Sequence, residues 1–186
     1  YGLGLYIKQL WINKMEKEAL LVIDMLNDFV EKGAPLEVPL ARKILPNIRK
    51  KIEWARKNKI PVIYICDSHR PEDKEFNWWP PHAIEGTSGA EIVKEISPQK
   101  KDFIVKKRRY SAFLGTELEL LLKELKVETI HLVGILTNIC VLYTAAEATM
   151  RGYNVVVYRD CVTSISPEDH SFALNQMENV LKIKIK

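Results

Sequence analysis

Short apolar runs alternate with longer amphipathic stretches along this chain, and that alternation restricts the folds it can adopt. The runs contain four to seven residues each and are rich in Val, Ile and Leu, which is typical of buried strands. They cover residues 19–23, 60–66, 102–105, 129–134, 154–158 and 180–186. Because strands that alternate with helices indicate a parallel sheet, the sequence predicts a three-layer α/β/α fold around a mostly parallel six-stranded sheet.

Five stretches between the runs fit helices. In the first of them, Ile44 and Ile48 recur at helical spacing on an apolar face. Thr116 is placed to cap a later helix, and Gly152 follows another as a helix C-terminal signal. The expected helices cover residues 41–58, 89–96, 115–126, 139–151 and 168–179. Residues 68–88 form the longest irregular stretch, and loops of this length in a compact domain are usually functional.

The length of the chain fits one domain. Its 186 residues, 47% of them hydrophobic, can bury a full core, and no linker divides residues 15–186. Residues 1–14 are expected to be an N-terminal extension whose origin the sequence leaves open, since they lack the features of a signal peptide. No run approaches the roughly 18 to 20 apolar residues that cross a bilayer, so no membrane partner is expected.

The cysteine count and the charge argue against two further classes of protein. The three cysteines are an odd and sparse set, which favours a reducing cytoplasm over a secreted disulfide framework. The net charge of +4 is modest. Its one dense cluster, residues 106–109, lacks interleaved aromatic side chains, so nucleic acid is not expected as a partner.

Reactive side chains follow four of the expected strands. They are Asp24, Asp67, His69, Lys107 and Cys140. In open parallel sheets ligands bind beyond the carboxyl ends of the strands, so we expect these side chains to share one edge of the sheet. A carboxylate, an ammonium and a thiol that converge in this way fit covalent acyl transfer.

Cys140 is the candidate nucleophile of this group. It lies in the first turn of an expected helix, where unpaired N–H groups carry partial positive charge and predict a stabilised thiolate. Taken alone, a free cysteine more often fills a small apolar site. The other reactive side chains at the same edge favour the nucleophile over that alternative.

The long loop carries the donors of an expected metal site. Asp67 and His69 lie two residues apart at a strand exit, and His82 follows in the same loop. One carboxylate and two imidazoles hold a divalent ion and leave positions open for water or a ligand, and Glu75 would add a fourth ligand. Surface hydrogen bonding explains many Asp-x-His pairs, but the neighbouring nucleophile favours the metal. The remaining histidines are expected to be structural and to lie away from this edge: His131 and His170.

Three segments resemble the isochorismatase-like cysteine hydrolases. They are VIDMLNDF at 22–29, KRRYSAF at 107–113 and GILTNICV at 134–141. The resemblance extends from residue 15 to the C-terminus and implies a single cysteine-hydrolase domain with the isochorismatase-like hydrolase fold. Within that superfamily, residues 67–69 and 79–82 are most similar to nicotinamidases, which use such residues to hold a metal.

The resemblance also implies a role for each site residue. The catalytic triad would be Asp24, Lys107 and Cys140. The metal ligands would be Asp67, His69 and His82, with Glu75 as a further ligand. The aromatic walls of the pocket would be Phe29, Trp79 and Tyr110. A cis peptide before Leu136 would turn the amides of Leu136 and Cys140 into an oxyanion hole. The three-residue spacing to Tyr110 selects Lys107 rather than Lys106.

The implied activity is that of a metal-assisted cysteine amidohydrolase that converts nicotinamide to nicotinate and ammonia through a Cys140 thioester. It implies a cytoplasmic homo-oligomer of NAD salvage, a small-molecule amide as its partner, and one divalent metal ion, zinc before iron or manganese. Leu26 stands where many relatives have Gln, and Asn138 where many nicotinamidases have an acidic residue. Another amide or a ureido compound therefore stays open as the substrate, as does a non-catalytic ligand-binding relative.

Overall fold

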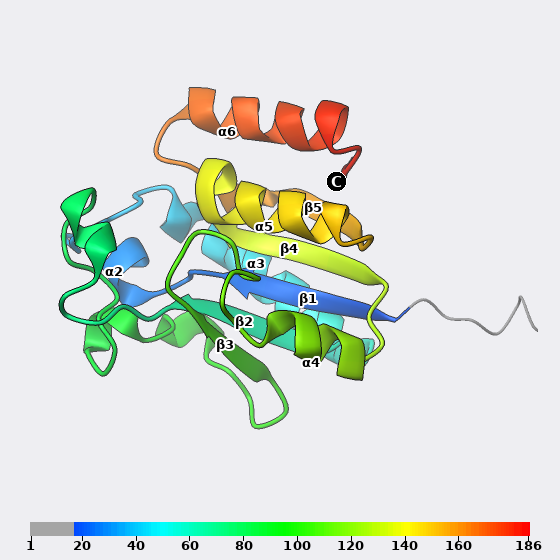
Figure 1. Ribbon diagram of the computed structural model, residues 1–186, viewed down its shortest axis with the longest axis horizontal. Helices are drawn as coiled ribbons and strands as arrows, with labels where there is room; N and C mark the ends of the chain where they lie inside the picture. The colour runs from blue at the N-terminus through cyan, green and yellow to red at the C-terminus, as the bar shows by residue number, and fades with distance from the viewer. Residues whose placement is uncertain (1–16) are drawn as a thin grey trace, which may run out of the picture.

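The computed structural model describes residues 17–186, and their strands form one parallel sheet. The strands are β1 (Glu18–Ile23), β2 (Val62–Asp67), β3 (Phe103–Lys107), β4 (Thr129–Ile135), β5 (Asn154–Thr163) and β6 (Lys184–Ile185). They lie in the order β3-β2-β1-β4-β5-β6, and each neighbouring pair runs parallel (Figure 1). The predicted six-stranded sheet is confirmed. The extension expected at residues 1–14 lies outside the described residues.

Helices cover both faces of this sheet and complete the three layers. In Figure 1, α3 (Ala41–Lys57) lies behind the sheet, whereas α4 (Leu118–Glu124) and α5 (Leu142–Met150) lie in front, and α6 (Pro167–Asn175) follows β5. Successive side chains of β1 point to opposite faces of the sheet and so belong to two apolar cores. Leu20 and Val22 pack toward α3, and Leu21 packs toward α4 and α5. Within residues 17–186, no helix is long and apolar enough to cross a membrane.

The helix expected at residues 89–96 is wrong. The structure has two separate 3-10 turns there, Ser88–Ala90 and Lys94–Ile96, with extended backbone between them. Leu26, just before the short helix α2 (Asn27–Val30), forms an antiparallel bridge with Ile92 in this segment. The bridge holds the backbone extended where a helix would have continued.

Other boundaries also differ from the sequence-based expectation. β5 is longer than expected and reaches Thr163. The strand expected over residues 180–186 shrinks to β6 because a π-type turn, Gln176–Val180, first extends α6. The helix expected from residue 115 begins at Leu118, whose N–H donates to Thr116 Oγ1 at 3.2 Å.

Gly134 lets β4 approach β1 beside the point where the chain leaves β1. Its φ of +117° lies in the region that favours glycine, and a Cβ built there would lie 2.1 Å from the Ile23 carbonyl oxygen. The residue that follows β1 is Asp24, which has a left-handed φ of 53°. Aspartate adopts this conformation more readily than most residues. The close contact at Gly134 therefore helps to fix where the Asp24 side chain emerges.

We expect Gly134→Ala to lower the free energy of unfolding by about 3 kcal/mol or more, because the backbone of β1 or β4 must move to admit a methyl group. Chemical denaturation followed by circular dichroism measures this loss. Gly152→Ala is the matched control, since Gly152 also has a positive φ (+86°) but has nothing within 4 Å of its built Cβ. The control should lose only about 1 kcal/mol. Equal losses in the two variants would contradict a packing constraint at Gly134.

Candidate active site

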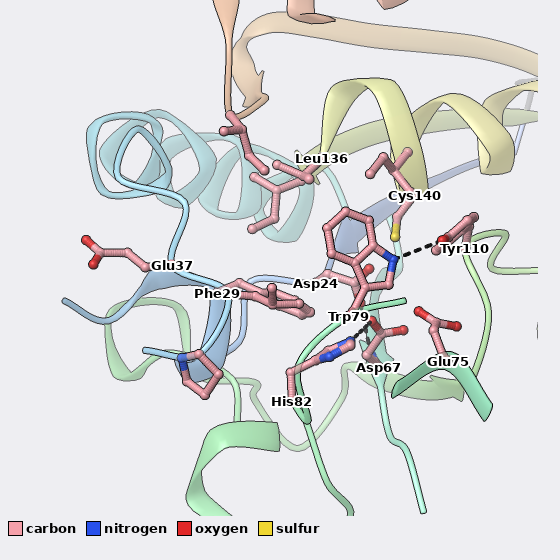
Figure 2. A pocket seen from close by; sticks show the side chains of 15 residues that line it. Asp24, Phe29, Glu37, Asp67, Glu75, Trp79, His82, Tyr110, Leu136 and Cys140 are labelled. Atoms are coloured by element: carbon pink, nitrogen blue, oxygen red, sulfur yellow. Dashed lines mark hydrogen bonds and ion pairs between the residues drawn. The ribbon is translucent and has the colours of Figure 1, made fainter. Parts of the chain in front are cut away.

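Four buried side chains meet where β1 to β4 end. Asp24 follows β1, Asp67 and Lys107 are the last residues of β2 and β3, and Cys140 lies in a π-type turn, Thr137–Val141, after β4. Asp24, Asp67 and Cys140 line a cavity of about 220 Å³ (Figure 2). The carboxyl ends of parallel strands meet at one edge of the sheet, and the structure brings these side chains together there.

The Lys107 ammonium lies at the centre of this group. Its Nζ lies 2.8 Å from Asp24 Oδ2 and 3.4 Å from Cys140 Sγ, and it also donates to Asp67 Oδ1. Burial alone would lower the pKa of Lys107, but the two carboxylates raise it well above its ordinary value. Lys106 points away from the group, because neighbouring side chains of a strand face opposite sides, and pairs at 2.6 Å with the exposed Glu85.

Burial also sets the protonation of the thiol. Burial and the nearby Asp67 carboxylate raise the pKa of Asp24 to about 6. Burial raises the pKa of the Cys140 thiol well above its usual value, although Lys107 opposes that shift. This shift favours the protonated thiol over the thiolate. Burial thus opposes the thiolate that the helix terminus and Lys107 favour, and Asp24 is the base beside the thiol.

A second group of donors shares Asp67. One ligand atom from each of Asp67, His69 and His82 lies within 4.8 Å of the other two, and all three residues are buried. The Nε2 atoms of His69 and His82 lie 3.6 Å and 3.9 Å from Asp67 Oδ2, the oxygen that Lys107 does not use. His69 Nε2 is fully buried and has no hydrogen-bond partner among the described residues. A buried, unpartnered nitrogen beside a free carboxylate oxygen fits a divalent metal ion.

The Nδ1 atoms of both imidazoles have hydrogen-bond partners, which leaves the Nε2 atoms available to a metal ion. His69 Nδ1 lies 3.2 Å from Asp73 Oδ2, and His82 Nδ1 lies 2.7 Å from the Pro80 carbonyl oxygen. Metal-binding histidines commonly donate their second N–H to such oxygens. With both Nδ1 atoms protonated, both Nε2 lone pairs face Asp67. This arrangement strengthens the fit to a metal.

Asp73 is a supporting residue that the sequence reasoning missed. It is buried, and it accepts hydrogen bonds from Arg108, Arg109 and the Glu75 N–H. Burial alone would raise the pKa of Asp73, but these donors hold it well below its usual value. The basic cluster at residues 106–109 is visible in the sequence. Only the fold shows that its two arginines, Arg108 and Arg109, donate hydrogen bonds to Asp73.

Glu75 lies outside the three-residue donor group. Its side chain lines the cavity, and its Oε2 is buried without a hydrogen-bond partner among residues 17–186. Arg109 Nη1 lies 3.7 Å from that oxygen. Burial, together with Asp67, raises the pKa of Glu75. The structure thus places Glu75 in the pocket and not with Asp67, His69 and His82.

Aromatic and apolar side chains form the remaining walls. Phe29, Trp79 and Tyr110 all line the cavity, as the sequence predicts for the pocket. Trp79 Nε1 donates to the Tyr110 hydroxyl at 3.0 Å, and the Phe29 ring lies 5.5 Å from the His82 ring (Figure 2). The other apolar residues that line the cavity are Pro35, Leu36, Ile135, Leu136, Ile139 and Ile165. A flat ring would find apolar surface here beside the polar group.

The turn that carries Cys140 is tied to the segment after β5. The Ile135–Leu136 peptide is cis, as the resemblance implies. Thr137 Oγ1 lies 2.9 Å from His170 Nδ1, and Ser164 Oγ donates to Asn138 Oδ1 at 2.9 Å. The expectation that His170 lies away from this edge is therefore wrong, because α6 returns over the turn.

His131 has the structural surroundings that the sequence predicts. It lies within β4, and its Nδ1 lies 3.0 Å from the Tyr158 hydroxyl. Its Nε2 lies 3.5 Å from Glu18, the first residue of β1. Since β1 begins at the opposite end of the sheet, His131 takes no part in the cavity.

Comparisons with known proteins agree with this geometry. Residues 18–184 match the profile of the isochorismatase domain family. The nicotinamidase PncA of Bacillus subtilis is 36% identical, with a TM-score of 0.87 over 91% of this chain and 98% of that chain. N-carbamoylsarcosine amidase from Thermoplasma acidophilum is 36% identical, with a TM-score of 0.84 over 91% and 95%. The pyrazinamidase of Pyrococcus horikoshii in complex with zinc is 33% identical, with a TM-score of 0.86 over 91% and 98%.

We expect Asp73→Asn to lower the affinity for zinc by about 10- to 100-fold, because the amide holds the His69 ring less firmly and loses its charge pairs with the two arginines. Competition with a chromophoric chelator measures this affinity. Asp102→Asn is the control, since Asp102 also pairs with an arginine, Arg56, but lies outside the donor group. Unchanged zinc affinity in Asp73→Asn would contradict the anchoring role.

Proposed function

Because this chain belongs to the isochorismatase family, we propose that it is a metal-assisted cysteine amidohydrolase that converts nicotinamide to nicotinate and ammonia. The observation that carries the proposal is that the two oxygens of Asp67 face different partners. Oδ1 accepts from Lys107 beside the thiol, and Oδ2 faces the two histidines. Asp67 thus joins the nucleophile to the metal donors, and apolar side chains lie beside both. This arrangement suits an aromatic amide as the substrate.

The chemistry follows from the positions of the thiol and its base. Asp24 takes the Cys140 proton as Sγ attacks the carboxamide carbon and forms a C–S bond. The backbone N–H groups of Leu136 and Cys140 stabilise the oxyanion that forms. The proton then passes from Asp24 to the leaving nitrogen, the C–N bond breaks, and ammonia departs from a Cys140 thioester. Water gives a proton to Asp24 as its oxygen attacks the thioester carbon. The C–S bond then breaks, the sulfur takes the proton from Asp24, and the released acid loses its own proton to solvent to give nicotinate.

The other side chains hold the reactants. Lys107 keeps its proton and offsets the charge on Asp24 and on the sulfur. Phe29 and Trp79 hold the ring against the walls of the cavity. When bound at Asp67, His69 and His82, a divalent ion supplies a Lewis-acid contact for the ring nitrogen, and zinc suits these donors, with iron or manganese as alternatives. The zinc complex of the Pyrococcus pyrazinamidase supports this assignment.

The second candidate function is the hydrolysis of another amide or of a ureido compound by the same chemistry. Asn138 favours it, since its side chain pairs with Ser164 where many nicotinamidases have an acidic residue. The similarity to an N-carbamoylsarcosine amidase favours it too. Ammonia release from a panel of amides and ureido acids separates the two functions. A non-catalytic relative would bind such compounds and release no ammonia.

We expect the purified protein to release ammonia from nicotinamide, and Cys140→Ala to reduce that rate by about a thousandfold or more, because Cys140 carries the only thiol among the described residues that line the cavity. A coupled ammonia assay measures both. Cys66→Ala is the control, since Cys66 is also buried but does not line this cavity. Substantial turnover by Cys140→Ala would remove Cys140 from the mechanism, and full turnover in excess chelator would remove the metal.

We also expect Lys107→Ala to lose about a hundredfold or more in kcat, because two carboxylates and the sulfur lose their counter-charge. Lys106→Ala should stay within about twofold of the wild type, since its partner Glu85 is exposed and outside the site. Circular dichroism confirms that each variant is folded before the assay. The opposite ranking of the two lysine variants would show that the wrong lysine has been placed in the mechanism.

A further inference from the structure

A second cleft lies at the ends of β2 and β3 and shares no lining residue with the cavity that holds the thiol. Its volume is about 450 Å³. The basic residues that line it are Arg70, Lys106, Lys107, Arg108 and Arg109, and Glu85 is the only acidic one among the described residues. Lys107 is already paired with the two carboxylates of the active site. Four further basic side chains therefore share this cleft with one carboxylate.

A carboxylate outside the cleft lining holds two of these arginines in place. The Asp73 side chain is fully buried, and its Oδ2 accepts from Arg108 Nε at 2.9 Å. Its Oδ1 accepts from Arg109 Nη1 at 3.0 Å. Among residues 17–186, Arg108 Nη1 and Arg109 Nη2 have no hydrogen-bond or ion-pair partner. Because the two guanidinium groups are already positioned, an anion that binds them loses less affinity to the ordering of side chains.

The other two basic side chains are only weakly engaged. Within the described part of the chain, the Arg70 side chain forms no hydrogen bond or ion pair. Lys106 Nζ lies 2.6 Å from Glu85 Oε1, but both side chains are more than half exposed, at 61% and 58%. An ion pair as exposed as this contributes little free energy. A dianion can therefore replace Glu85 as the partner of Lys106 at small cost.

We propose that this cleft binds the phosphate group of a small phosphorylated molecule. Guanidinium groups donate pairs of hydrogen bonds that match phosphate oxygens, and a doubly charged phosphate gains more from several cations than a carboxylate does. The Ser68 hydroxyl lines the same cleft and offers another donor. Leu114, which is 59% exposed, offers apolar surface to the rest of the ligand. The volume of the cleft falls within the range of small-molecule sites, roughly 300 to 1,000 Å³.

Calorimetry with phenyl phosphate tests the site without requiring turnover. The protein as purified with its metal is titrated at a pH above the second pKa of a phosphate monoester, about 6, so that the probe is a dianion. One molecule should bind per chain, and phenol, which lacks the phosphate, should not bind. Arg70→Gln combined with Lys106→Gln should weaken the binding of phenyl phosphate by about tenfold or more. These two residues lie outside the amide-hydrolysing machinery, so the double variant should release ammonia at about the wild-type rate.

A matched double variant separates this site from a change in net charge. Arg49→Gln combined with Lys101→Gln removes the same two charges from exposed residues that do not line the cleft, and should change the affinity for phenyl phosphate by less than about twofold. Equal weakening in the two double variants would overturn the proposal, as would the absence of saturable binding. Unchanged binding in Arg70→Gln with Lys106→Gln would place the anion elsewhere, at the metal donors of the catalytic pocket.

A titration with single-stranded RNA tests the size of the ligand. Short RNAs of increasing length should bind no more tightly than phenyl phosphate, because the cleft offers one small group of cations. An affinity that rises steadily with RNA length and falls steeply with salt would identify nucleic acid as the ligand and overturn the assignment to a small molecule.

Discussion

The site depends on one buried ammonium, that of Lys107, held between two buried carboxylates. Removing one member of such a group leaves an uncompensated charge in the interior, at a cost of about 3 to 5 kcal/mol. Lys107 ends β3, Asp67 ends β2 and Asp24 follows β1, and these strands are neighbours in the sheet. Their parallel register brings the three charges together without any long loop. The close approach of β4 at Gly134 then places the turn with Cys140 beside them.

Asp67 connects this charge group to the metal donors. One oxygen accepts from Lys107, and the other faces the histidine nitrogens. Each histidine is oriented from behind, His69 by the Asp73 carboxylate and His82 by the Pro80 carbonyl oxygen. The arrangement requires the long loop after β2 to fold back over the sheet edge. The irregular stretch that the sequence predicts to be functional is thus the part of the chain that supplies the donors.

The sequence predicts the sheet and the residues at its edge because both follow from local patterns. Short apolar runs give the strands, and the residue at the end of each parallel strand lies at the common edge. Contacts between distant segments do not follow from such patterns. Arg108 reaches Asp73, and His170 reaches Thr137, only because the loop and α6 return over the site. The raised pKa of the Cys140 thiol does not follow from local patterns either, since burial is a property of the whole fold.

The central claim is that Asp67 serves the Lys107 ammonium with one oxygen and a metal ion with the other. A crystal structure of the protein loaded with zinc, with anomalous data collected on both sides of the zinc edge, tests this directly. The account predicts one anomalous peak per chain, bounded by Asp67 Oδ2, His69 Nε2 and His82 Nε2, with Lys107 still on Asp67 Oδ1. A peak at other residues, or a structure in which the ion displaces Lys107 from Asp67, would contradict it.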